Sequence, residues 1–346
     1  MEKKILICPL FDPWYYEFYL KGLYDFYKDY TIEFSFEDRF LRFKEFVNGP
    51  YKKEFFYYEI WENGHVKKIC VAANDKCEVN ETVYDGADVY AKVNVDEATL
   101  QSHSRLLPIG PNFGINYLSI PNYLNLSWKL YRKAGIKNPY FRVYTHQSLK
   151  RCSFDVYADR KPAKDNYLFY LNYPWKKHTN VTNLRKEIIT MLQELDREKV
   201  ISFTGGFSRR RLGPFEGLEQ YSAGKRYNHK AYLQQLKQSA VAINTPAVHD
   251  CLGWKLGEYI ALGKAIITTP INRVLPGNFV AGTHYMEIKD IHAELKEAIR
   301  YLVAHKEERM ELEQNTLAYF EKYLTPAKAV AHIHSFAFKK AGAVHI

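Results

Sequence analysis

The sequence lacks any uninterrupted apolar run near the roughly 18 residues that a membrane-spanning helix requires, because charged residues interrupt every hydrophobic stretch. The apolar run that begins at Ile5 is too short for the hydrophobic core of a secretory signal. The five cysteines are an odd number and include no closely spaced pair of the kind that binds a metal. We therefore expect a cytoplasmic protein that neither spans a bilayer nor depends on disulfides.

Two common nucleotide-binding motifs are also missing. Gly205-Gly206 follows a predicted strand, but the Lys-Ser/Thr of a phosphate-binding loop does not follow it, and the sequence contains no G-x-G-x-x-G. These absences argue against a kinase and a dehydrogenase. There is no internal repeat and no low-complexity segment, and 47% hydrophobic and 25% charged residues are typical of a globular protein.

The length of the chain indicates more than one domain. At about 150 residues per domain, 346 residues predict two. A charged stretch at 151–166 with a central proline suits a linker. We therefore predict an N-terminal domain at residues 1–155, a C-terminal domain at 165–325 and a helical tail at 326–346.

The first half mixes strand and helix patterns. Asn63-Gly64 separates two strand-like runs and supplies the backbone angles of a tight hairpin turn. The segment 106–124 is rich in Pro, Gly and Asn, so we expect a loop over most of it. The other predicted elements are strands at 4–8, 31–36, 54–61, 65–73 and 87–93, and helices at 15–27, from 36 to about 47, and at 126–134.

The second half alternates more regularly between strands and helices. Such alternation requires right-handed parallel crossovers, so we expect a doubly wound α/β sheet with ligands at the carboxyl ends of its strands. The predicted strands are 167–172, 200–204, 240–244 and 265–268, and the predicted helices are 181–195, 229–238, 254–262, 291–302, 310–323 and a final one from Pro326.

The segment 249–267 carries the most chemical information. Asp250, Gly253 and Glu258 surround the start of a helix that follows a strand. A helix start offers unpaired backbone N–H groups and a positive dipole end, which suit a diphosphate. We expect Glu258, about one turn into the helix, to accept both hydroxyls of a ribose, and Asp250, before the helix, to accept hydroxyls of a hexose. The alternative is an ordinary helix in which Asp250 caps the start and Glu258 faces solvent.

This segment resembles the C-terminal domain of GT-B-fold nucleotide-sugar glycosyltransferases of the glycosyl transferases group 1 family. The family motif is an acid, seven residues, a glutamate and then Ala-x-Gly-x-Pro/Ala-Ile-Ile. This chain matches it with Asp250, Glu258 and residues 261–267, although its first acid is Asp where the family more commonly has Glu. The resemblance covers roughly residues 165–330. It implies two Rossmann-like domains facing a cleft, with a C-terminal helix that returns to the N-terminal domain. The donor-binding residues that it implies are His249, Asp250, Cys251, Leu252, Gly253 and Glu258.

Glycosyl transfer also requires positive charge at the leaving diphosphate. Because no Asp-x-Asp pair stands in a fitting context, we expect no metal and no cofactor other than the donor. The family's basic pair has no obvious place here, although Arg185-Lys186 lies near where it would fall. The candidate cations are Lys176, Lys177, Arg209 and Lys225, each with the alternative of an ordinary surface residue.

A general base is expected in the loop after the first strand of the N-terminal domain. Asp12 is the only titratable residue of that loop, and the alternative is a turn residue ahead of Pro13. His103 is a second candidate, with an ordinary loop histidine as the alternative.

Charge and aromatic content bear on the acceptor. The net charge is +10, spread along the chain without a basic tail, and there are 28 Tyr and 21 Phe. We interpret the protein as a cytoplasmic, metal-independent glycosyltransferase of polysaccharide biosynthesis with a glycan or lipid-linked glycan acceptor and peripheral contact at the inner membrane face. The alternatives are a nucleotide-sugar epimerase on the same fold and a nucleic-acid-binding protein, although no nucleic-acid-binding motif is present.

Overall fold

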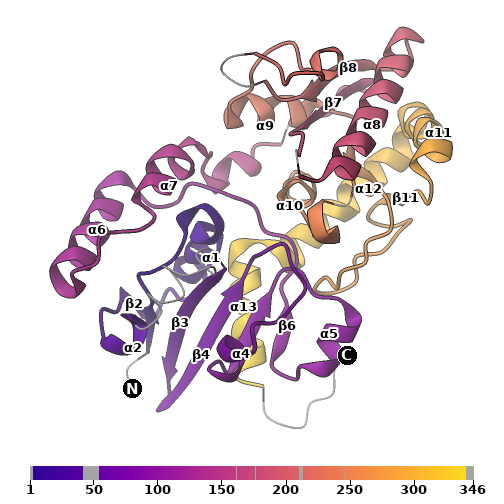
Figure 1. The fold of residues 1–346 in the computed structure, drawn as a ribbon. Helices are drawn as coiled ribbons and strands as arrows, with labels where there is room; N and C mark the ends of the chain where they lie inside the picture. The colour runs from indigo at the N-terminus through magenta and orange to yellow at the C-terminus, as the bar shows by residue number, and fades with distance from the viewer. Residues whose placement is uncertain are drawn as a thin grey trace. The chain divides into compact units, whose positions relative to one another are not determined.

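The computed structural model describes residues 3–41, 54–160, 162–175, 177–209, 213–245 and 247–339. The chain forms two compact units (Figure 1). Unit 1 consists of Met1–Phe154, Arg273–Gly277 and Lys322–Ile346, and unit 2 of Asp155–Asn272 and Asn278–Glu321. Both units combine helices with largely parallel strands, so the predicted α/β class is confirmed. The C-terminal residues Lys322–Ile346 belong to unit 1.

Unit 1 is built on a six-stranded sheet in the order β2-β1-β3-β4-β5-β6. β3 is antiparallel to both β1 and β4, and the remaining neighbours are parallel. Every strand except β3 therefore runs in one direction. The strands are β1 (Lys4–Ile7), β2 (Thr31–Phe34), β3 (Phe55–Glu62), β4 (His65–Ala72), β5 (Val89–Lys92) and β6 (Leu106–Pro108).

The hairpin between β3 and β4 confirms the prediction made from Asn63-Gly64. Asn63 has a φ of 51° and Gly64 a φ of 79°, the left-handed pair that a two-residue hairpin turn requires. The strands pair from Glu62 with His65 to Phe55 with Ala72.

The helices of unit 1 include one that begins earlier than expected. α6 starts at Ile120, because the Ser119 side chain accepts a hydrogen bond from the backbone N–H of Asn122 at 3.3 Å and Pro121 suits the first turn. Residues 109–119 form the expected loop, but the helix begins at Ile120 where we expected it at residue 126. The helix predicted to reach about residue 47 lies mostly outside the described residues. The helices are α1 (Pro13–Phe26), α2 (Asp38–Leu41), α4 (Glu81–Asp85), α5 (Glu97–Ser102), α6 (Ile120–Ala134), α7 (Phe141–His146) and α13 (Pro326–Ala337).

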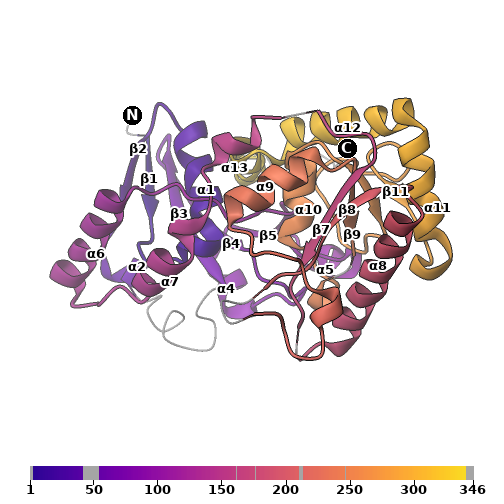
Figure 2. The ribbon, with the colours of Figure 1, turned by 90° about the horizontal axis from the view of Figure 1, so that it is seen from above.

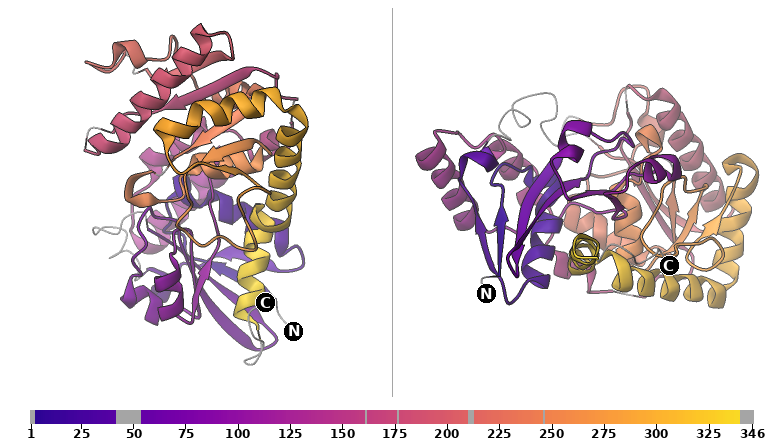
Figure 3. Two further views of the ribbon diagram at one scale, coloured as in Figure 1. Left: turned by 90° about the vertical axis from the view of Figure 1, so that its right-hand side faces the viewer. Right: turned by 90° about the horizontal axis from the view of Figure 1, so that it is seen from below.

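Helix α13 packs against α1 within unit 1 (Figure 3). A Cβ atom built on Gly22 of α1 would lie 2.2 Å from the Pro326 carbonyl oxygen, so only glycine permits this approach. The Tyr27 hydroxyl lies 3.1 Å from His334 Nδ1. These contacts attach the C-terminal segment to the N-terminal residues.

Unit 2 contains only parallel strands in its described residues. β7 (Tyr167–Asn172) pairs with β8 (Ser202–Phe207), and β10 (Ala265–Thr268) lies between β9 (Val241–Asn244) and β11 (Met286–Glu287). The backbone N–H of Ala240 donates to the Tyr167 carbonyl at 2.7 Å and links the two sets.

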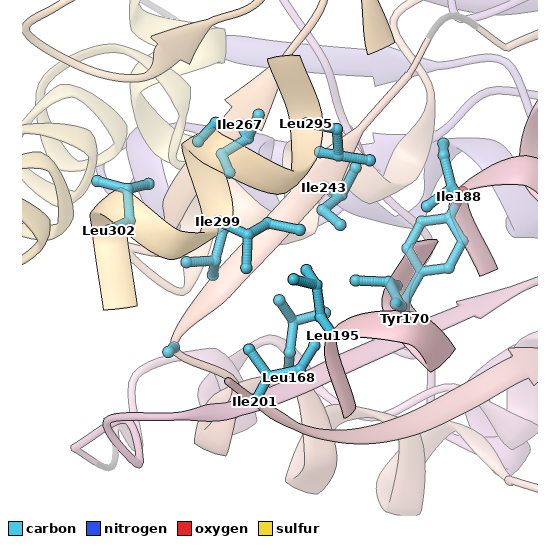
Figure 4. Close-up of a cluster of buried hydrophobic side chains, with 14 of the residues drawn as sticks. Leu168, Tyr170, Ile188, Leu195, Ile201, Ile243, Ile267, Leu295, Ile299 and Leu302 are labelled. Atoms are coloured by element: carbon cyan, nitrogen blue, oxygen red, sulfur yellow. The ribbon is translucent and has the colours of Figure 1, made fainter. Parts of the chain in front are cut away.

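Three helices connect consecutive strands: α8 (Thr179–Arg197), α9 (His229–Gln238) and α10 (Trp254–Ala261). α11 (Ile291–Ala304) and α12 (Lys306–Tyr319) follow β11. Figure 2 shows the strands of unit 2 between α9 and α10 on one side and α8 and α11 on the other, the doubly wound arrangement that we predicted. Apolar side chains from α8, α11 and the strands form one buried core, which includes Ile188, Leu195, Ile243, Ile267 and Ile299 (Figure 4).

Strand β8 continues through the two glycines at which we expected it to stop. Gly205 has a φ of 138°, and a Cβ there would lie 2.0 Å from the Tyr170 carbonyl oxygen. Gly206 has a φ of 119°, and its Cβ would lie 2.3 Å from the Tyr221 carbonyl oxygen. The glycines therefore allow close backbone packing inside the strand.

Candidate functional site

The loop between β9 and α10 contains two non-glycine residues in the left-handed region. His249 has a φ of 60° and Asp250 a φ of 54°. Such residues cost on the order of 1 kcal/mol each and cluster at functional sites. Asp250 Oδ2 accepts a hydrogen bond from Asn272 Nδ2 at 3.1 Å. Asp250 does not cap α10, because Gly253 occupies the N-cap position, so that alternative is wrong.

Asp250 lines a cavity of about 350 Å³ within unit 2, here named the Asp250 cavity. The ring centroids of His178 and His249 lie 5.9 Å apart. Two imidazoles, an amide and a carboxylate therefore surround a space large enough for a polar ligand. The lining residues are His178, Asn180, Val181 and Leu184 around the start of α8, and Ala247, Val248, His249 and Asp250 before α10.

Two cations lie at the carboxyl end of β7. Lys255, the second residue of α10, donates from Nζ to Asn172 Oδ1 at 2.6 Å and to the Leu171 carbonyl. Arg185 of α8 is buried and donates from its guanidinium to the Tyr173 carbonyl at 2.8 Å. Burial lowers the pKa of both groups, and the Arg185 charge further lowers the pKa of Lys255, well below its ordinary value.

No carboxylate of the described residues forms an ion pair with either cation, although the Glu258 charge partly offsets the effect of burial on the pKa of Lys255. Across the described ranges, Arg185 and Lys255 take part in no ion pair, and Arg185 Nε is buried without a hydrogen-bond partner. A charge removed from water is costly unless an opposite charge or a ligand compensates it. The arrangement is therefore suited to an anion.

The start of α10 lies in the same part of unit 2. A Cβ atom on Gly253 would have only the Ala247 Cβ nearby, at 3.7 Å, so the backbone there is open to approach. Cys251 and Leu252 are buried at 7% and 6% exposure, so both act through the backbone or the packing of the loop. A helix start with accessible N–H groups adds to the attraction for an anion.

Glu258 has a different environment from the one we expected. The side chain is buried, so the solvent-facing alternative is wrong. The hydroxyls of Tyr157 and Tyr232 each donate to its carboxylate at 3.0 Å, and His229 Nε2 lies 3.1 Å from Oε1. Burial, followed by the Glu258 charge, raises the pKa of Tyr232 well above its ordinary value. Glu258 does not line the Asp250 cavity, and its contact with a ribose stays a prediction.

The remaining basic candidates lie elsewhere. Lys177 is exposed, and Arg209 donates to the Gly224 carbonyl at 3.1 Å. Lys225 Nζ lies 5.4 Å from the centre of the Tyr227 ring. None of these three lines the Asp250 cavity, and Lys176 lies outside the described residues. From the sequence we noted Arg185 only as a basic residue near the expected place of the family's basic pair. We did not select Lys255 as a candidate cation, although its position two residues after Gly253 was the available signal.

The two candidate bases lie in unit 1. Asp12 is buried and caps α1, with Oδ1 accepting from the Trp14 N–H at 3.0 Å. His103 follows α5, and its contacts with the Thr99 carbonyl at 2.9 Å and Glu81 at 3.2 Å raise its pKa. Asp12 follows the carboxyl end of β1, whereas His103 precedes the amino end of β6, so the two lie at opposite edges of the sheet. Their catalytic roles stay predictions.

The family match covers this part of the chain. Residues 185–335 match the model of a family described as glycosyl transferase-like. This stretch of the chain is therefore similar to that family. The match includes Asp250, Glu258, Arg185 and Lys255, and it confirms the predicted resemblance to GT-B-fold glycosyltransferases for this part of the chain.

Solved structures of low sequence identity are also similar. The alignment with TarM covers 77% of this chain and 50% of that one, at 9% identity and a TM-score of 0.44. The alignment with an α,α-trehalose-phosphate synthase (UDP-forming) from Burkholderia vietnamiensis covers 74% of this chain and 60% of that one, at 12% identity and a TM-score of 0.41. The alignment with Anabaena Alr3699/HepE in complex with UDP covers 77% of this chain and 71% of that one, at 15% identity and a TM-score of 0.38. The chain spans less than two thirds of the first two structures, and no curated protein matches it.

Two further observations concern membranes and metals. None of the described helices combines the length and the apolar character that crossing a bilayer requires. Within the described ranges, no three His, Cys, Asp or Glu side chains are grouped so as to hold a metal ion.

Proposed function

We propose that this chain transfers a sugar from a nucleoside diphosphate sugar to an acceptor hydroxyl. The observation that carries the proposal is the pair Arg185 and Lys255, two cations without a carboxylate partner in the described part of the chain, set beside the start of α10. A diphosphate supplies the negative charge that this pair lacks. The match of residues 185–335 to a glycosyl transferase-like family supports the same assignment.

Each group has a role in this proposal. Arg185, Lys255 and the first N–H groups of α10 stabilise the charge that develops on the departing diphosphate, which makes a metal ion unnecessary. Asp250 accepts hydroxyls of the transferred hexose beside the cavity that it lines. Glu258 accepts the ribose hydroxyls, which replace Tyr157 or Tyr232 as donors to its carboxylate.

The chemistry of the acceptor is less closely defined than that of the donor. The net charge of +10 and the abundant aromatic residues suit a glycan or lipid-linked glycan that carries negative charge, as in polysaccharide biosynthesis in the cytoplasm. Asp12 and His103 remain the candidates for the base that activates the acceptor hydroxyl.

Titration calorimetry with uridine, guanosine and cytidine diphosphate sugars tests the donor site. We expect binding of donors with one base, weakened about tenfold or more in Lys255→Met and in Arg185→Met, because each variant removes a charge-assisted contact. Thermal stability should be retained, since each substitution also removes a poorly compensated cation. Lys230→Met, which removes an exposed lysine of α9, is the matched control.

Two results would overturn the proposal. One is the absence of heat with every donor, and the other is unchanged affinity in both variants at unchanged stability. Product analysis then separates the enzymatic alternatives, because an epimerase changes its donor without any acceptor, whereas a transferase forms its product only when acceptor is present.

A further inference from the structure

Helix α6 of unit 1 carries an apolar stripe on its outer face. Successive members of the stripe are four, four and three positions apart, which places them within about a quarter of the circumference of an ideal helix. The four side chains are large and about half exposed: Ile120 at 52%, Leu124 at 48%, Trp128 at 59% and Tyr131 at 57%.

The stripe is not the face by which α6 packs on unit 1. Tyr123, Leu126 and Leu130 are buried at 2%, 4% and 0% exposure and anchor the helix from its other side. Tyr123 also stacks on Tyr144 of α7 with the ring centroids 3.7 Å apart. Contiguous exposed apolar surface of this kind marks an interaction site in a folded protein.

The part of the chain that contains the stripe is strongly basic. Residues 98–154 contain eight Lys or Arg and no Asp or Glu, so this one segment accounts for most of the net charge of +10. The charge is therefore less evenly spread than we expected. Three of the eight lie on α6 and are exposed: Lys129, Arg132 and Lys133. Lys137 in the following loop and Arg142 in α7 are exposed as well.

We propose that the outer face of α6 docks the protein on an anionic phospholipid surface. Ile120 and Leu124 enter the boundary between headgroups and acyl chains, and Trp128 and Tyr131 occupy the interface that such rings prefer. Lys129 and Arg132 bind the lipid phosphates. A nucleic acid would engage the basic residues but would leave the aliphatic ones without a role. This docking is independent of the sugar-transfer proposal.

Vesicle flotation with the full chain tests the docking. We expect the protein to float with vesicles of phosphatidylcholine and phosphatidylglycerol and to remain in solution with phosphatidylcholine alone. The pair Lys129→Gln and Arg132→Gln should weaken binding about fivefold for each residue removed, because each cation contributes about that factor at an anionic surface. The pair Leu124→Ser and Trp128→Ser should weaken it about tenfold or more, through lost apolar burial.

The control variants remove exposed side chains of unit 2. Tyr301→Ser is the control for the apolar pair, and Lys230→Gln is the control for the basic pair. Both controls should float like the original protein. Donor calorimetry should be unchanged in all four α6 substitutions, which separates a failure of the docking from a failure of the donor site.

Four outcomes would overturn the docking: no flotation, equal flotation with both lipid mixtures, binding unaffected by either pair, or a dimer that the Leu124 and Trp128 substitutions dissociate. Tighter binding to an oligonucleotide that depends on Lys129 and Arg132 but not on the stripe would assign the face to nucleic acid.

Discussion

The Tyr157 hydroxyl donates a hydrogen bond to Glu258 Oε1 at 3.0 Å, although the two residues are 101 positions apart. Tyr232 donates to the other carboxylate oxygen, and His229 lies beside the first. The cluster thereby ties the first residues of unit 2 to α9 and α10. Glu258 is consequently part of the packing of unit 2 as well as the candidate ribose contact.

Glu258→Ala should lower the free energy of unfolding by about 3 kcal/mol, because it leaves the Tyr157 and Tyr232 hydroxyls without their acceptor and removes the contact with His229. Tyr157→Phe should cost only about 1 kcal/mol, since it removes a single hydrogen bond. Thermal denaturation followed by circular dichroism measures both. Glu297→Ala, at a side chain that is 77% exposed on α11, is the control. Equal melting temperatures for Glu258→Ala and Glu297→Ala would contradict the prediction.

Glu17 should make the stability of unit 1 depend on pH. Its Oε2 accepts the Tyr117 N–H at 2.9 Å, its Oε1 is buried, and burial raises its pKa from 4.5 to about 8. The folded state thus keeps a proton that the unfolded state releases near 4.5. This stabilisation is fully present below pH 4.5 and is lost as the pH rises through about 8.

Glu17→Gln should remove that dependence, because an amide imitates the protonated carboxyl at every pH. Melting temperatures between pH 5 and 8 measure the effect, which corresponds to on the order of 3 kcal/mol in the original protein. Glu33→Gln, at an exposed residue of β2, is the control and should retain the original slope. An unchanged slope in Glu17→Gln would show that Glu17 is already ionised in the folded protein.

Gly22→Ala tests the packing of α13 on α1. An exposed helical glycine normally gains about 1 kcal/mol on replacement by alanine. At this position the new Cβ would meet the Pro326 carbonyl oxygen at 2.2 Å, so we expect destabilisation by about 2 kcal/mol or more. Thermal denaturation measures it, and hydrogen exchange should show faster opening of α13.

Gly86→Ala is the control for this substitution, because its Cβ would have no atom closer than 3.7 Å. A melting temperature of Gly22→Ala at or above that of the original protein would contradict the packing of these two helices.

Much of the local structure was predictable because neighbouring residues decide it. The positive φ angles that Asn63-Gly64 tolerates produced the β3–β4 hairpin, and β7 and β10 span the predicted 167–172 and 265–268. Local patterns failed where a single interaction decided the outcome. The Ser119 cap moved the start of α6, and the packing of Gly205 against Tyr170 kept β8 extended.

The candidate site divides in the same way. Asp250, Gly253 and Glu258 were identifiable from their spacing, because the strand and helix around them follow from local periodicity. The orientation of Glu258 toward Tyr157 and the approach of Lys255 to Asn172 join residues that are 101 and 83 positions apart. Arg185 contacts Tyr173, 12 positions away, and its burial beside Lys255 depends on the tertiary structure.

The sequence by itself determined the α/β class, most helices and strands, and the acidic pair around α10, since hydrophobic periodicity and turn chemistry act over a few residues. Tertiary structure alone decided which cations form no ion pair, which hydroxyls donate to Glu258, and which face of α6 is exposed. Those outcomes depend on contacts with distant parts of the chain, and the spacing of nearby residues does not specify which distant groups make those contacts.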